Sequence, residues 1–114
     1  MSVLRGMAVA LLLASVLLAP SLAVAADPPD IPLTIENNRF QPEEIKVKAG
    51  AGFVLAITNK DKSAEEFESK DLRIEKVIPA GKTVKLKMPA LKPGSYGFVG
   101  EYHEKTAKGR IVAE

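Results

Sequence analysis

The chain has 114 residues, with no Cys, one His, and 16 basic against 14 acidic residues. This length leaves room for one small domain and excludes a multidomain enzyme. Because the charges are so evenly balanced, the sequence shows no basic surface of the kind that binds nucleic acid, and we expect no nucleic-acid partner. The absence of Cys excludes disulfides, iron–sulfur clusters, zinc ribbons and every other thiolate-ligated metal centre.

The first 26 residues have the pattern of a secretory signal peptide. One positive charge precedes an almost wholly apolar run over 6–19, and Pro20 breaks that run before the small residues of 23–26. The run is shorter than the roughly 20 apolar residues that a membrane-spanning helix needs. We therefore expect residues 1–26 to be cleaved, and the mature domain of 27–114 to be a periplasmic protein that does not span the membrane.

The mature sequence alternates apolar and polar residues with the period of two that is typical of strands. The run from Phe53 to Ile57 is apolar on both parities, which predicts a central strand covered on both faces. No segment has the pattern of an amphipathic helix. We predict an all-β fold, a single-domain antiparallel Greek-key sandwich. Its strands are expected near 33–35, 40–47, 53–58, 72–78, 84–88, 96–98 and 110–113.

Several short motifs give the mature chain a resemblance to the cupredoxin family over its whole length. They are Phe40-Gln41-Pro42, Ala49-Gly50, a strand that ends at Asn59, Pro79-Ala80-Gly81-Lys82, and Pro93-Gly94-Ser95-Tyr96-Gly97-Phe98. The segments 65–72, 100–104 and 107–109 are similar to the small periplasmic cupredoxin-like proteins of the EfeO type. That resemblance implies a role beside an inner-membrane iron permease of the bacterial Ftr or Efe kind.

The resemblance also shows where this chain departs from a blue copper protein. His103 occupies the place of a copper-binding His, but Gly100 stands where the Cys is expected and Ala107 where the axial Met is expected. In this alignment Glu68 takes the place of the first His. Because both sulfur ligands are missing, no blue copper site is predicted, and electron transfer of that kind is excluded.

Four residues are the candidate metal ligands: Glu66, Glu68, Glu101 and His103. Glu66 and Glu68 lie two apart, so if this stretch is extended both carboxylates face the same side. The resemblance implies that Glu68 and His103 meet at one end of the sandwich, and Glu101 lies in the same loop as His103. Carboxylates with one imidazole suit iron, manganese, zinc or oxidised copper. We therefore predict an iron or copper ion at this place.

Three functions follow from these residues. The first is a metal-binding accessory that captures ferrous iron, or helps to oxidise it, for a membrane iron permease. The second is a stand-alone ferroxidase, which a single His and the lack of a visible second redox centre disfavour. The third is a protein-interaction module without metal, in which the acidic residues of 65–68 form a solvated surface. The first is our leading hypothesis, and it makes the protein an accessory rather than an enzyme.

Overall fold

The computed structural model describes Gly6, residues 10–20 and residues 27–114. Residues 10–20 are exposed and form no helix or strand. Across the described residues, no helix has the length and apolar character needed to cross a membrane. The predicted signal peptide lies partly outside the described residues, and its cleavage stays a prediction.

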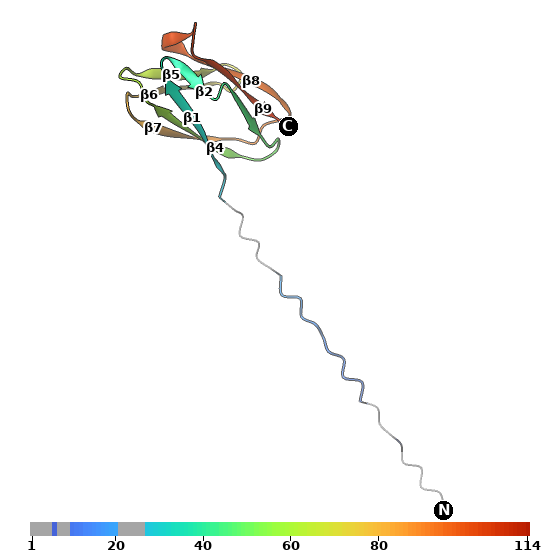
Figure 1. Ribbon diagram of the computed structural model, residues 1–114. Coiled ribbons are helices and arrows are strands. Elements are labelled where there is room, and N and C mark those ends of the chain that lie inside the picture. The colour runs from blue at the N-terminus through green and yellow to red at the C-terminus, as the bar shows by residue number, and fades with distance from the viewer. Residues whose placement is uncertain (1–5, 7–9, 21–26) are drawn as a thin grey trace, which may run out of the picture.

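Residues 27–114 fold into a two-layer β-sandwich (Figure 1). The all-β, single-domain prediction is confirmed. The elements of this range are β1 (Asp30–Glu36), β2 (Arg39–Gln41), β3 (Glu44–Val47), β4 (Phe53–Asn59), β5 (Glu65–Ser69), β6 (Ile74–Ile78), β7 (Thr83–Met88), β8 (Gly94–Gly100), the 3₁₀ turn η1 (Glu101–His103) and β9 (Lys108–Ala113).

The two sheets are mixed rather than purely antiparallel as predicted. One sheet has the order β2-β1-β4-β7 and the other β3-β9-β8-β5-β6. Two pairs are parallel, β1 with β4 and β3 with β9. The reason is the path of the chain. After β1 it passes through β2 and then crosses to the other sheet as β3, so it returns as β4 in the direction in which β1 ran.

The period of two places one face of each strand between the sheets. In β4, Phe53, Leu55 and Ile57 are buried, whereas the residues between them are only half-buried. The prediction of cover on both faces was wrong, because a sandwich has two layers and the outer face of β4 has no third layer over it. Opposite β4, Phe67 and Phe98 pack with ring centroids 5.1 Å apart in the core.

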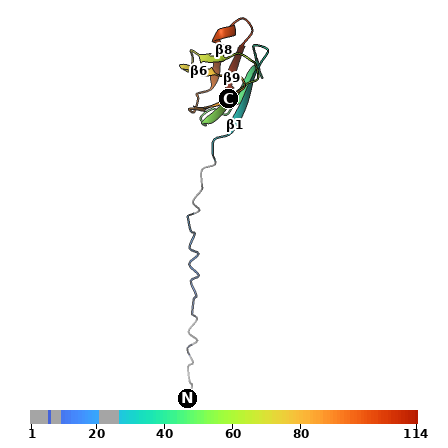
Figure 2. The same ribbon diagram turned by 90° about the vertical axis from the view of Figure 1, so that its left-hand side faces the viewer.

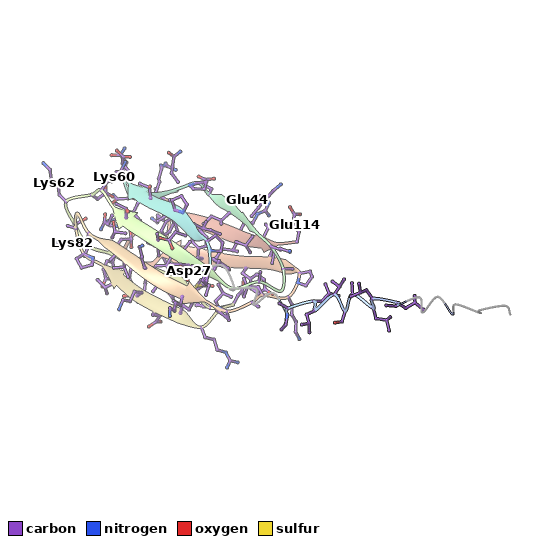
Figure 3. The ribbon with its side chains drawn as sticks, turned by 90° about the horizontal axis from the view of Figure 1, so that it is seen from below. Asp27, Glu44, Lys60, Lys62, Lys82 and Glu114 are labelled. Carbon is purple, nitrogen blue, oxygen red and sulfur yellow. The ribbon has the colours of Figure 1, made fainter. Side chains whose placement is uncertain are left out.

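The end of the sandwich toward which β1 runs carries the loops that hold candidate site residues. Figures 1 and 2 show η1, in orange, at this end and away from the start of β1. The loop between β4 and β5 lies here too, and Figure 3 shows Lys60 and Lys62 of this loop beside Lys82 at one end of the domain.

The loop between β4 and β5 is fixed by one buried side chain, that of Asn59. Its Nδ2 donates to the carbonyl oxygens of Ser63, at 2.9 Å, and Ile78, at 3.0 Å, while its Oδ1 accepts from the backbone N–H of Asp61 at 2.9 Å. A buried amide with all these partners costs little to bury. It sets the point at which β5 begins, and so the position of Glu65.

Candidate metal site

A buried carboxylate, that of Glu65, lies at the end of the sandwich that carries η1. The side chain of Glu65 is 2% exposed, and its Oε2 lies 2.5 Å from Nδ1 of His103. Its Oε1 accepts hydrogen bonds from the backbone N–H groups of Glu66 and Tyr102, each at 3.0 Å. A carboxylate can be buried when hydrogen bonds satisfy its oxygens in this way. The pair joins the start of β5 to η1.

The loop of 101–107 holds His103 against Glu65. Ala107 N–H donates to the carbonyl oxygen of His103 at 2.8 Å, and Gly100 N–H donates to the carbonyl oxygen of Ala107 at 2.9 Å. The hydroxyl of Thr106 donates to the carbonyl oxygen of Asn38, at 2.6 Å, in the turn between β1 and β2. The imidazole is thus carried by a loop that is tied to both sheets.

Gly100 leaves the space that the Glu65 carboxylate fills. A Cβ atom at Gly100 would lie 2.6 Å from Cδ of Glu65 and 2.7 Å from Cβ of Ala107, closer than real Cβ atoms approach. Ala107 is itself fully buried. The carboxylate therefore lies against Gly100, and a side chain at position 100 would compete with it for this volume.

Three further carboxylates gather on the outer side of the same end. One oxygen from each of Glu66, Glu75 and Glu101 lies within 4.8 Å of the others. A hydrogen bond with Glu66, and then the negative charges of Glu66 and Glu68, raise the pKa of Glu101 to about 7. Desolvation, followed by the charge of Glu66 and a hydrogen bond with it, raises the pKa of the Tyr102 phenol. The carboxylates of this cluster therefore repel one another, and a bound cation would reduce that repulsion.

The four predicted ligands are divided between these two groups. Glu66 and Glu68 share one face of β5, opposite the buried Phe67, as expected. The carboxylate that contacts His103, however, is that of Glu65 and not that of Glu68. Alternation along β5 turns residues 65, 67 and 69 inward, so Glu68 faces outward. The predicted meeting of Glu68 with His103 was wrong by three residues.

Glu101 lies with Glu66, and the sequence analysis missed the third member of that group. Glu75 belongs to β6, where it is paired in register with Glu68. Only the pairing of β5 with β6 brings it near, so no local sequence signal marks it. Glu65 did have a signal, because it precedes the core residue Phe67 by two positions on the same strand. Metal binding by Glu66, Glu68, Glu101 and His103 stays a prediction.

A groove of about 630 Å³ lies next to the site on the outer face of the second sheet. Gly97 and Gly109 form part of its lining, and side chains of both charges surround it. They are Glu68, Lys70, Asp71, Glu104, Lys105 and Lys108. The groove is open and carries mixed charge.

Comparison with known proteins assigns the fold to a family. The sequence model of the cupredoxin-like domain family matches residues 7–113, and the chain belongs to this family. An uncharacterized protein of Rickettsia prowazekii (strain Madrid E) is 35% identical over 83 residues, a match that covers 73% of this chain and 66% of that protein.

Two solved structures illustrate the similarity of fold. Auracyanin A, a blue copper protein from Chloroflexus aurantiacus, superposes with a TM-score of 0.65 at 15% identity, covering 75% of this chain and 99% of its own. A purple cupredoxin from Nitrosopumilus maritimus gives a TM-score of 0.59 at 15% identity, covering 75% of this chain and 100% of its own. At these identities the likeness concerns the fold alone.

A blue copper ion does not fit this chain. The sequence has no Cys to supply the thiolate. At the two positions that the sequence analysis matched to the Cys and the axial Met, Gly100 and Ala107 offer no donor atom. The carboxylate of Glu65 takes the space in which a side chain at position 100 would begin. The chain keeps the cupredoxin fold without the site for which blue cupredoxins use it.

Proposed function

We propose that this protein is a periplasmic accessory that captures ferrous iron and passes it to an inner-membrane iron permease. One observation carries the proposal. At the end of the sandwich that the cupredoxin resemblance associates with metal binding, the chain has a part-buried Glu65–His103 pair beside the carboxylates of Glu66, Glu75 and Glu101. Iron is the cargo here rather than a resident cofactor.

The donor set suits this cargo. Carboxylate and imidazole donors bind iron, and they hold ferric iron more firmly when carboxylates are in the majority. Glu75 and Glu101 are exposed, and the Glu66 side chain is half-buried, so an ion bound there would remain open to solvent. An open, carboxylate-rich site exchanges its ion more readily than a closed site of four buried ligands. Ready exchange is what a protein that must hand on its ion requires.

Iron uptake by intact cells tests the proposal. Deletion should slow the uptake of ferrous iron at low external iron, and His103→Ala in its place should behave like the deletion. Glu36→Gln, an exposed carboxylate on β1 in the other sheet, is the matched control and should restore uptake. Normal uptake in the deletion strain would overturn the proposal.

Experiments with the purified protein distinguish the proposal from two alternatives, a stand-alone ferroxidase and an interaction module without metal. Rapid multiple-turnover oxidation of ferrous iron by the isolated protein would indicate a ferroxidase. Anaerobic calorimetry that detects no binding of ferrous iron, together with slowed uptake in the deletion strain, would indicate an interaction module. The open groove of mixed charge beside the site is the feature that favours this second alternative.

A further inference from the structure

The function proposed above needs a nitrogen of His103 that is free to bind a metal, and the two ring nitrogens have different surroundings. Nδ1 lies 2.5 Å from Oε2 of Glu65, whose side chain is almost wholly buried. Nε2 has no hydrogen bond to any described residue, yet within the described chain no buried side-chain nitrogen or oxygen lacks a partner. Nε2 therefore reaches solvent, which agrees with the 30% exposure of the side chain.

We propose that Glu65 is a positioning residue that holds neutral His103 as the Nδ1–H tautomer and so leaves Nε2 as the metal-binding atom. An ionised carboxylate offers only acceptor sites, so the nitrogen that faces it must carry a proton. A neutral imidazole has one proton to place, and the other nitrogen then keeps a free lone pair. This inference rests on the proposed function for its metal, but not for its tautomer.

The position of Glu65 first suggests that a metal would bind on the inner side of His103, at Nδ1, whereas the hydrogen bonds favour the outer nitrogen, Nε2. The Glu65 carboxylate lies against Gly100, the place of the missing Cys, and Nδ1 of His103 faces this carboxylate. An ion bound there would have to displace the Nδ1 proton and break into a carboxylate that already has three hydrogen-bond partners. An ion bound at Nε2 leaves all three bonds in place. A carboxylate that orients the far nitrogen of a metal-binding His is a common support of metal sites.

The single His makes this tautomer measurable without ambiguity. In ¹⁵N-labelled protein, long-range ¹H–¹⁵N correlation spectra show the two nitrogens of one imidazole only. With the pH raised until the ring is neutral, as its own nitrogen shifts report, we expect a protonated Nδ1 and an unprotonated Nε2. Free imidazole side chains favour the opposite tautomer. An Nε2–H ring in the metal-free protein would overturn the proposal, and would place the shared proton on Glu65.

Glu65→Gln gives a sharper test, because it should invert the tautomer. The amide oxygen must stay at the place of Oε1, where two backbone N–H groups point at it. The amide NH₂ then faces Nδ1 and requires it to accept, so the ring proton moves to Nε2. A purely structural role would not reverse the two nitrogens. An unchanged Nδ1–H ring in this folded variant would count against the proposal, and Glu36→Gln is the control that should keep the wild-type pattern.

Zinc, a diamagnetic ion that imidazole and carboxylate bind, is the probe of coordination. In the wild type, Zn²⁺ should shift Nε2 while Nδ1 keeps its proton, and Glu65→Gln should weaken binding by about 10–100-fold, as is usual when such a support is lost. Loss of the Nδ1 proton on zinc binding, or bound zinc that moves neither nitrogen, would overturn the coordinating role. Absence of binding by both zinc and ferrous iron would instead overturn the proposed function, while the metal-free spectrum still decides the tautomer.

Discussion

Gly100→Ala adds one methyl group at the point where the Glu65 carboxylate is held. The backbone of Gly100 has φ −87° and ψ 107°, an extended conformation open to any residue. The substitution therefore strains no dihedral angle, and its whole effect comes from crowding. The added Cβ would lie 2.6 Å from Cδ of Glu65, 2.8 Å from its Oε2 and 2.7 Å from Cβ of Ala107.

The expected loss of stability follows from three contributions. Overpacking a buried site costs about 1–3 kcal/mol. Displacing the carboxylate weakens hydrogen bonds to a charged group, each worth roughly 1.5–3 kcal/mol. Replacing Gly by Ala returns about 0.4–1 kcal/mol by restricting the unfolded chain. We expect a net loss of about 3 kcal/mol, which lowers the melting temperature of a domain of this size by roughly 12–24 °C.

Urea and thermal unfolding of the variant measure this loss, and the same strand supplies a control. A Cβ atom at Gly97, also in β8, would meet only Oδ2 of Asp71 at 3.8 Å, so Gly97→Ala should change stability by less than about 1 kcal/mol. In a Glu65→Ala background the penalty of Gly100→Ala should shrink, leaving the contact with Ala107. A Gly100→Ala protein as stable as the Gly97→Ala protein would refute the reasoning, as would an equal penalty in both backgrounds.

Three other predictions concern the leader, the acidic cluster and the absent copper ligands. Exported protein should begin at Ala26 or Asp27 by intact mass, and a retained leader would contradict the proposed processing. Glu101, with its pKa raised from 4.5 to about 7, binds more protons folded than unfolded in that interval, so the free energy of unfolding should fall as pH rises through it. Denaturation at pH 5 and pH 8 should show that fall in the wild type and less of it in Glu101→Gln. Because Glu65 and not Glu68 contacts His103, the copper ligands to introduce are Glu65→His, Gly100→Cys and Ala107→Met. The combined variant should yield a visible copper–thiolate absorption band with Cu²⁺, and a colourless protein would contradict the inference that these three positions surround His103.

Most of the strands were predictable because their signal is local, but β5 (Glu65–Ser69) was not among the expected strands, because its charged residues resemble those of a loop. The alternation of Val84, Leu86 and Met88 with lysines describes one strand on one surface, and β7 has that pattern at the edge of its sheet. The parallel pairs were not predictable in this way. Alternation is the same in parallel and antiparallel strands, and the direction of β4 beside β1 depends on a crossing between sheets that no local pattern records.

The candidate site was predictable by region but not by residue. The acidic stretch of β5 and the single His were identified, and both lie at the same end of the sandwich. The error concerned which residues of β5 face inward, because a charged residue was not expected on the inward face. Glu65 is buried there among core residues because His103 and two backbone N–H groups satisfy its carboxylate. Two of these partners, His103 and the N–H of Tyr102, lie far along the chain, and the third is the N–H of the next residue, Glu66.

The missing Cys and the buried Glu65 are physically linked. The Glu65 carboxylate that reaches Nδ1 of His103 lies where a Cβ atom at position 100 would begin, and that Cβ atom would also meet Cβ of Ala107. Glu65 can take this place only because position 100 has no side chain. A Cys at position 100 and the buried carboxylate of Glu65 therefore exclude one another. Under the function proposed above, this carboxylate supports His103 from the inside, and a metal would bind on the outer side, at Nε2 and at the carboxylates on the surface of β5, β6 and η1.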